Sequence, residues 1–151
     1  VRGPTGCRYL ADDRQSDYVQ DGWNITGDSF SMDAEGYLHF AARNDDMIIS
    51  SGYNIAGPEV EAVLMAHEAV LECAVIGIPD PDRGHIVQAH VVVHEGTEPS
   101  DATAAMLQGH VKATIAPYKY PRSVVFTAAL PKTETGKVQR YVLRNVGKGT
   151  S

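Results

Sequence analysis

Two long apolar runs, VLECAVIGI at residues 70–78 and IVQAHVVVH at residues 86–94, constrain the fold of this chain most strongly. Both runs are rich in β-branched residues, which favour strands, and turn residues bound them. The loop PDPDRG, residues 79–84, joins the two runs. We therefore expect both to be strands of one small sheet.

Other local patterns add helices and strands around these two runs. Residues 58–67 (PEVEAVLMAH) predict a helix, because Pro58 suits a first helical position and two early glutamates favour the helix dipole. Ser100 is expected to cap a second helix that runs to about residue 114. RSVVF at 122–126 predicts a strand, and KVQRYVLRN at 137–145 predicts a short closing helix. The pattern indicates an α+β fold with a three-stranded sheet and helices.

The first part of the chain has a different texture. Short strand-like runs occur at residues 7–10, 23–26 and 37–40, and DAEG at 33–36 is typical of a turn. MIIS and SGYN, residues 47–54, then predict a β-hairpin with its bend near Gly52. After RNDD, residues 43–46, the short strand-like runs give way to the hairpin and the longer helix and strand patterns, so we expect a domain boundary near Asp45. Because the chain begins VRGPTGC, without Met, we expect it to be the C-terminal portion of a longer protein.

Composition excludes several classes of protein. A hydrophobic share of 43% with 21% charged residues is unlike a disordered chain. The net charge of −6 argues against non-specific nucleic-acid binding, so no nucleic-acid partner is expected. No apolar run approaches the ~20 residues that span a bilayer, and no signal-peptide pattern is present. Cys7 and Cys73 lie far apart in the sequence, which suits reduced thiols in a cytoplasmic protein.

The motifs that would indicate a metal or a Walker-type phosphate site are missing. Four strand residues separate His90 from His94 by ~13 Å, which is too far to share an ion. The other histidines have no zinc-like spacing, so no metal ligands are expected. The run from Gly52 to Gly57 resembles half of a P-loop, but Pro58 stands where the lysine is required.

Three separated stretches, in this order and spacing, resemble the adenylate-forming superfamily and, within it, the acyl-CoA synthetases. They are GWNITGD at 22–28, ARNDDMIISSGYNIAGPEVE at 42–61 and PKTETGK at 131–137. PDPDRG and APYKYPR (116–122) resemble the branch that uses medium-chain or aromatic acids. GPTGCRYL, residues 3–10, resembles most the benzoate-CoA and 2-aminobenzoate-CoA ligases.

The resemblance implies an enzyme that works in two steps. A carboxylic acid reacts with ATP to give an acyl-adenylate and pyrophosphate, and CoA then displaces AMP. Residues 1–44 would end the large N-terminal domain, and residues 45–151 would form a mobile C-terminal lid. The family's phosphate loop and acid pocket lie upstream, so the large domain would be the lid's partner and would bind the Mg²⁺ that accompanies ATP. We expect this chain alone to be inactive.

Motif positions carry the adenylation residues over to this sequence. Asp28 would hold the ribose hydroxyls, because a carboxylate accepts two hydrogen bonds well, and Arg43 would contact the nucleotide. Asp45 corresponds to the hinge. Lys137 would neutralise the negative charge that develops during adenylation. Taken alone, these would be read as a turn aspartate, a surface arginine, a cap and a solvated loop lysine.

The resemblance also implies a set of CoA contacts. The hairpin bend should approach CoA during thioester formation, although a tight bend by itself also favours glycine. Asn54 departs from the basic residue that relatives often carry there. Cations and an aromatic ring suit the phosphates and adenine of CoA. The expected CoA-binding residues are Ser51, Gly52, Tyr53, Arg83, Lys112 and Tyr120.

Alternative functions remain open at this stage. An adenylation domain that loads a carrier protein would replace the CoA contacts with a protein surface, and Arg83 and Lys112 weigh mildly against it. A non-catalytic lid-like binding domain is disfavoured by the strands that open the chain. Among acids, an aryl acid of the benzoate or 2-aminobenzoate type is expected, with a medium-chain fatty acid next.

Overall fold

The computed structural model describes residues 19–146, so Cys7 and the strand expected at 7–10 lie outside the described residues. The chain separates between Asp45 and Asp46 into two compact units. We call residues 19–45 unit 1 and residues 46–146 unit 2, and each is described by itself.

Unit 1 consists of two small antiparallel pairs of strands. β1 (Val19–Gln20) pairs with β2 (Trp23–Asn24), and β3 (Asp28–Met32) pairs with β4 (Leu38–Arg43). The turn expected at 33–36 is confirmed, because Asp33 accepts hydrogen bonds from the amides of Glu35 and Tyr37. β3 was not predicted from the sequence. Its sequence DSFSM has little strand propensity, and pairing with β4 decides its conformation.

Unit 2 begins with the hairpin that was expected around Gly52. A 3₁₀ turn, η1 (Asn44–Asp46), leads into β5 (Met47–Ser50), which pairs with β6 (Tyr53–Ala56). Ser50 of β5 also pairs with Gly84. The hairpin is therefore part of one five-stranded sheet of order β6-β5-β8-β7, with β9 beside β8, and is not separate from a three-stranded sheet as expected.

The two apolar runs form the longest strands of this sheet. β7 (Val70–Asp80) and β8 (Gly84–Val93) are antiparallel and extend into the predicted loop, because Pro79 and Asp80 pair with His85 and Gly84. Pro79 is tolerated because β7 is an edge strand. β9 (Ser123–Phe126) lies parallel to β8.

The helices follow their local signals. α2 (Gly57–Met65) carries its proline in the first turn, and α3 (Asp101–Thr114) is capped by Ser100, whose hydroxyl accepts from the amide of Thr103. The short η2 (Pro117–Lys119) follows α3. α4 (Arg140–Val146) begins three residues later than expected. The amide of Gln139 donates to Pro131 O, which holds the preceding residues in a closed loop.

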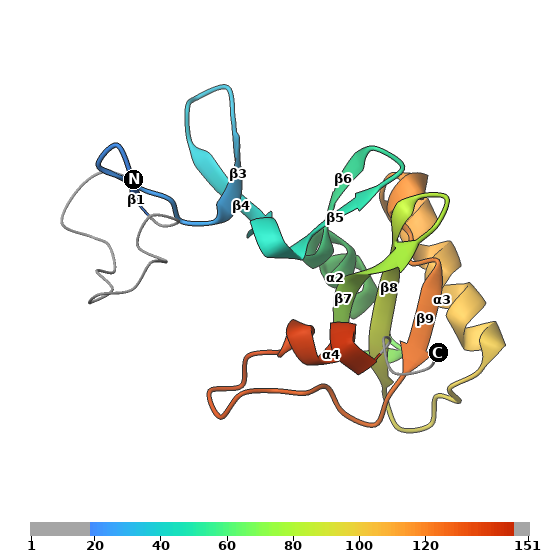
Figure 1. Ribbon diagram of the computed structural model, residues 1–151. Helices are drawn as coiled ribbons and strands as arrows, with labels where there is room; N and C mark the ends of the chain where they lie inside the picture. The colour runs from blue at the N-terminus through green and yellow to red at the C-terminus, as the bar shows by residue number, and fades with distance from the viewer. Residues whose placement is uncertain (1–18, 147–151) are drawn as a thin grey trace. The chain divides into compact units, whose positions relative to one another are not determined.

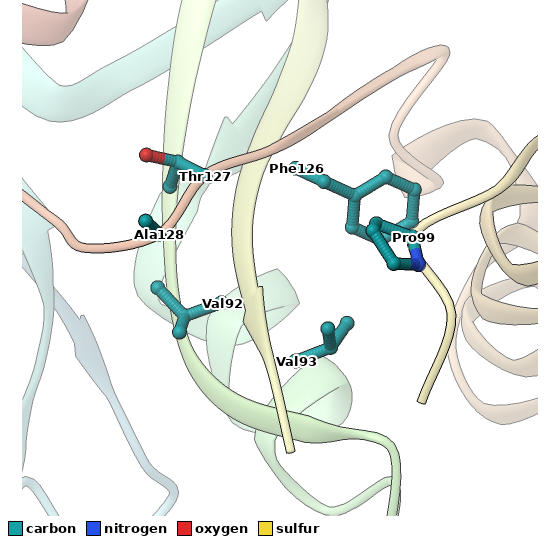
Figure 2. Close-up of a pocket in the computed structure, with 6 residues that line it drawn as sticks. All are labelled: Val92, Val93, Pro99, Phe126, Thr127 and Ala128. Atoms are coloured by element: carbon teal, nitrogen blue, oxygen red, sulfur yellow. The ribbon is translucent and has the colours of Figure 1, made fainter. Parts of the chain in front are cut away.

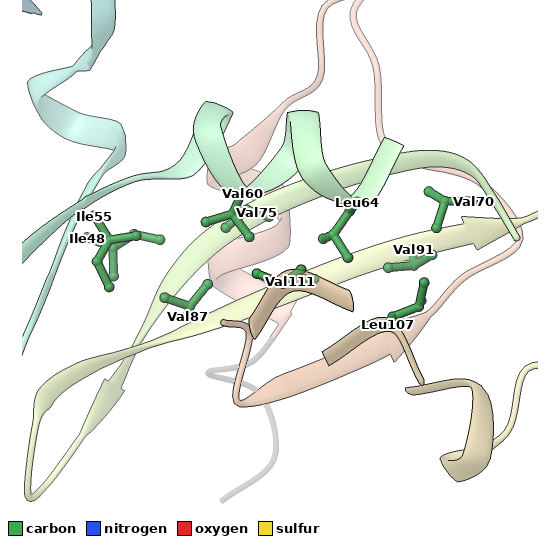
Figure 3. Close-up of a cluster of buried hydrophobic side chains, with 11 residues drawn as sticks. Ile48, Ile55, Val60, Leu64, Val70, Val75, Val87, Val91, Leu107 and Val111 are labelled. Atoms are coloured by element: carbon green, nitrogen blue, oxygen red, sulfur yellow. The ribbon is translucent and has the colours of Figure 1, made fainter. Parts of the chain in front are cut away.

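The core of unit 2 lies on both faces of the sheet. α2 and α3 cover one face, where their side chains pack on alternate residues of β7 and β8 (Figure 3). The residues between these alternate positions face α4 and Leu130 in a second, smaller cluster. This alternation is the period of two expected of a strand that is buried on both faces. The α+β fold class is confirmed.

Candidate functional site

Asp28 and Arg43, predicted to act together on a nucleotide, lie opposite each other in unit 1. They are register partners at the end of the β3–β4 pair. Arg43 Nη1 lies 3.9 Å from Asp28 Oδ1, and more than half of the Arg43 side chain is exposed. The amide of Asn44 donates to Gly27 O and fixes the chain beside this pair. A long, exposed ion pair of this kind contributes little to folding, so both side chains are available to a ligand.

The position predicted for the hinge coincides with the division between the two units. Asp45 lies in η1, the last residue before that division. Asp46 belongs to unit 2 through its side chain, because Oδ1 accepts a hydrogen bond of 2.6 Å from Arg144 and Oδ2 lies 3.8 Å from Arg140. These contacts fix the Asp46 side chain to α4 within unit 2.

The bend of the β5–β6 hairpin has an unusual backbone. Ser51 and Gly52 both have positive φ values, 49° and 83°. Gly52 is exposed, and a Cβ atom there would meet no described atom within 4 Å. The backbone, and not crowding, therefore favours glycine within this chain. Arg83 holds the bend from outside, since its carbonyl accepts from the Ser51 amide at 2.9 Å and its Nη1 donates to Ser51 Oγ at 3.0 Å.

Aromatic rings and cations gather next to this bend. The rings of Tyr53 and Tyr118 stack with their centroids 4.4 Å apart. Lys112 Nζ lies 4.0 Å from the centre of the Tyr120 ring, and Arg122 donates to the Tyr120 hydroxyl at 2.9 Å. The structure thus places Lys112 against the Tyr120 ring, whereas Arg83 contacts Ser51. Tyr118 and Arg122 were not predicted as site residues, although both lie in the stretch APYKYPR.

Lys137 follows a tight turn formed by residues 133–136. The Thr133 amide donates to Lys137 O at 2.8 Å, and the Lys137 amide donates to Thr133 Oγ1 at 3.1 Å. Gly136 has a φ of 81°, which a side chain would disfavour. The Lys137 residue is exposed, and no acidic partner for it occurs among residues 19–146. Lys132, on the same loop, is instead paired with Glu72.

Two open hollows lie in unit 2. One, of about 440 Å³, is lined by Gly136 and Val138 of the Lys137 loop and by residues of α2 and β7, including Cys73. The other, of about 350 Å³, is mainly apolar and lies at the end of β8 and β9 (Figure 2). None of the predicted site residues lines the second hollow.

Buried histidine and cysteine side chains, metal ligands and membrane helices could each be signs of other functions. His90 is buried, and its Nε2 lies within hydrogen-bond distance of Gln88 Oε1, at 3.0 Å. Burial lowers the pKa of His90. Cys73 is a free, partly buried thiol. Within the described residues, no group of three His, Cys, Asp or Glu side chains could hold a metal ion. No helix in the described part of the chain is long and apolar enough to cross a membrane.

Comparison with known proteins shows the family. The family described as "AMP-binding enzyme C-terminal domain" matches residues 59–137, more than half of the chain, and the chain belongs to it. The chain is 48% identical over 132 residues to the uncharacterized acyl-CoA ligase YtcI of Bacillus subtilis, covering 87% of this chain and 25% of YtcI. It is 53% identical over 123 residues to the mitochondrial acyl-coenzyme A synthetase ACSM4 of Rattus norvegicus, covering 80% of this chain and 21% of that protein.

A solved structure supports the same assignment. The anthranilate CoA ligase AuaEII in complex with anthranoyl-AMP is 40% identical, with a TM-score of 0.78. The match covers 89% of this chain and 26% of AuaEII. The resemblance to the C-terminal portion of acyl-CoA synthetases is therefore confirmed. The chain spans only about a quarter of the length of these relatives.

Proposed function

We propose that this chain is the C-terminal part of an ATP-dependent acid-CoA ligase, in which residues 1–44 end the large adenylation domain and residues 45–151 form a mobile lid. In the first step, the acid carboxylate attacks the α-phosphorus of ATP and releases pyrophosphate. In the second, the CoA thiol attacks the acyl carbon and displaces AMP. The large domain would hold the acid and the Mg²⁺ that accompanies ATP. Membership of the family and the names of the relatives support this proposal.

The exposed Lys137 is the observation that carries the proposal. Its turn is tightly hydrogen-bonded, while no acidic side chain of residues 19–146 neutralises its ammonium group. An ammonium group held in this way is available for an anion supplied from outside the lid. It would stabilise the negative charge that develops as pyrophosphate leaves, and it would then depart when the lid turns.

The arrangement of unit 2 supports a lid with two working ends. In Figure 1 the loop that precedes α4 and the bend between β5 and β6 lie at opposite ends of the unit. A single orientation of a rigid unit cannot bring both ends to one point. We infer that Lys137 serves adenylation, that the hairpin bend serves thioester formation, and that the chain pivots at Asp45 between the steps.

Asp28 and Arg43 would bind the nucleotide throughout both steps. The Asp28 carboxylate can accept hydrogen bonds from two adjacent ribose hydroxyls, because its contact with Arg43 at 3.9 Å leaves acceptor positions open. Arg43 keeps an exposed guanidinium group that can contact a phosphate or the ribose.

The surface beside the hairpin bend would bind CoA. Arg83, Lys112 and Arg122 supply positive charge for the phosphates. Tyr53 and Tyr118 are exposed and offer aromatic surface suited to an adenine. The Tyr120 ring carries the two cations Lys112 and Arg122 beside it. Glycine at position 52 would let the backbone lie close to the reacting thiol. Use of free CoA would distinguish this enzyme from one that loads a carrier protein.

For the acid, we propose an aryl acid of the benzoate or 2-aminobenzoate type. Support comes from the stretch GPTGCRYL and from the likeness to a ligase crystallised with anthranoyl-AMP. A medium-chain fatty acid is the alternative that the PDPDRG and APYKYPR stretches favour. A cytoplasmic location, expected from the cysteines, stays part of this proposal, since ACSM4 is named as mitochondrial.

The test is the Lys137→Ala variant of the full-length protein that carries this chain. Two rates would be measured: formation of the acyl-adenylate from acid and ATP, and conversion of preformed acyl-adenylate by CoA. We expect the first to fall by about 100-fold or more and the second to survive. Lys132→Ala is the matched control, because it removes a cation from the same loop that is already paired with Glu72. Equal losses of both rates, or no loss, would contradict the proposal.

A further inference from the structure

Four charged side chains form a cluster where α2, α4 and the start of unit 2 meet. We call Asp46, Glu61, Arg140 and Arg144 the ion cluster. Arg140 Nη2 donates to both carboxylate oxygens of Glu61, at 2.7 and 2.8 Å. Its Nη1 lies 3.8 Å from Asp46 Oδ2, and Arg144 donates to Asp46 Oδ1. The cluster therefore connects three segments that lie far apart in the sequence.

The cluster is shielded from solvent. The side chains of Glu61 and Asp46 are 16% and 18% exposed, and that of Arg140 is 24% exposed. Glu61 Oε1 also accepts from the Val75 amide at 2.8 Å, which ties the cluster to the edge strand β7. Charges in such a place gain little net stability, because desolvation offsets their attraction. Their directional hydrogen bonds can instead select one arrangement of the segments that carry them.

Arg140 lies three residues after Lys137, and the intervening residues are held at both sides. Val138 forms an antiparallel bridge with Lys132 and packs against the smaller core cluster. The amide of Gln139 donates to Pro131 O at 2.8 Å. Arg140 then begins α4 and is fixed by Glu61. The backbone from Lys137 to α4 is thus held by backbone pairing to residues 131–132, by the apolar packing of Val138 and by the ion pair of Arg140.

We propose that Arg140 and Glu61 are positioning residues for Lys137. They hold the Lys137 turn at a constant place relative to Asp46, the first residue of unit 2. Rotation at Asp45 would then move Lys137 together with the rest of the unit. The guanidinium group of Arg140 contacts both Glu61 and Asp46. One side chain therefore connects the Lys137 turn to the first residue of the unit. This proposal rests on the proposed function of Lys137 in adenylation.

The experiment compares Glu61→Gln, Arg140→Gln and the double variant in the full-length protein. Glu61→Gln leaves Arg140 with only its long contact to Asp46, and Arg140→Gln leaves Glu61 without a cation. The double change removes the Glu61–Arg140 pair together. We therefore expect stability to fall in the single variants and to recover largely in the double variant. Glu59→Gln is the matched control, because it removes a carboxylate from the same helix whose partner is Lys119.

Two readouts separate positioning from stability. Amide hydrogen exchange at Thr133, Lys137 and Gln139 should speed up about tenfold in all three variants, a change in opening free energy of about 1.4 kcal/mol. Exchange in β7 and β8 should return to normal in the double variant. The adenylation rate should fall about 10- to 100-fold in all three, as expected for a displaced catalytic group, while thioester formation is retained. The Glu59→Gln control should leave exchange in the turn unchanged.

Recovery of turn exchange and of adenylation together with stability in the double variant would overturn the proposal, because the pair would then be merely structural. Unchanged exchange in the turn of the single variants would also overturn it. If the wild-type protein forms no acyl-adenylate, the proposed function fails. The exchange measurement still decides in that case whether Glu61 and Arg140 hold the turn.

Discussion

The ring of Tyr53 stacks on the ring of Tyr118, with the two planes 24° apart and the centroids separated by 4.4 Å. Tyr53 lies directly after the hairpin bend, and Tyr118 lies in η2, more than sixty residues later in the chain. Tyr53 and Tyr118 are 53% and 41% exposed as whole residues. The stack therefore holds the bend against η2 and still offers aromatic surface to a ligand.

Replacing Tyr118 by Ala should raise the KM for CoA by about 2- to 10-fold, because an aromatic pair contributes about 0.5–1.5 kcal/mol beyond its buried area. The rate of acyl-adenylate formation should not change. Steady-state kinetics with CoA as the varied substrate measures the first effect, and single-turnover adenylation measures the second. Tyr118→Phe keeps the ring and should behave like wild type. An equal effect of Phe and Ala would show that the hydroxyl, not the stack, is responsible.

Replacing Asp28 by Asn should raise the KM for ATP by about 10- to 100-fold, since hydrogen bonds to a charged group contribute about 1.5–3 kcal/mol. The free energy of unfolding should change by less than about 1 kcal/mol, because the pair with Arg43 is long and exposed. Asp33→Asn is the control, since that carboxylate accepts from two turn amides in the same unit. It should affect the unfolding transition and leave the KM for ATP alone. An unchanged KM for ATP in Asp28→Asn, with a raised KM in Asp33→Asn, would show that Asp28 does not bind the nucleotide.

Burial raises the pKa of the Cys73 thiol from 9.0 to about 12, with the Glu61 charge adding to the shift and Arg140 opposing it. Below pH 9 the thiol is protonated in both the folded and unfolded states. Between pH 9 and about 12 only the unfolded state loses the proton, so stability falls as pH rises. Urea unfolding at pH 8 and pH 10 should therefore show a loss of about 1 kcal/mol in wild type that is absent in Cys73→Ala. Equal losses in both proteins would contradict the assignment.

Replacing Ser100 by Ala should lower the free energy of unfolding by about 1 kcal/mol, because the hydroxyl caps α3 through the Thr103 amide at 3.3 Å. Thermal or urea unfolding measures the change. Ser100→Asp supplies another good capping side chain and should restore stability. If Asp is as destabilising as Ala, the lost contact is the one with the Thr103 hydroxyl at 3.1 Å and not the cap.

Local sequence signals predicted the elements whose conformation is decided within a few residues. Ser100 identified the start of α3, Pro58 the start of α2, and Gly52 the bend of the hairpin. Pairing between distant strands was less predictable. β3 was missed because its residues favour a strand only when β4 lies beside them. The closing helix begins only at Arg140, because the Gln139 amide donates to Pro131 O and keeps the preceding residues in a loop.

The residue types of the candidate site were also readable from the sequence, because three motifs in one order carry them. Their roles stay predictions that the experiments above test. Only the tertiary structure decided which side chains meet. Arg83 holds Ser51 from 32 residues away, Tyr118 stacks on Tyr53, and Arg140 reaches Glu61 across 79 residues. Such contacts depend on how helices and strands pack around a shared core, and no local periodicity or propensity encodes that packing.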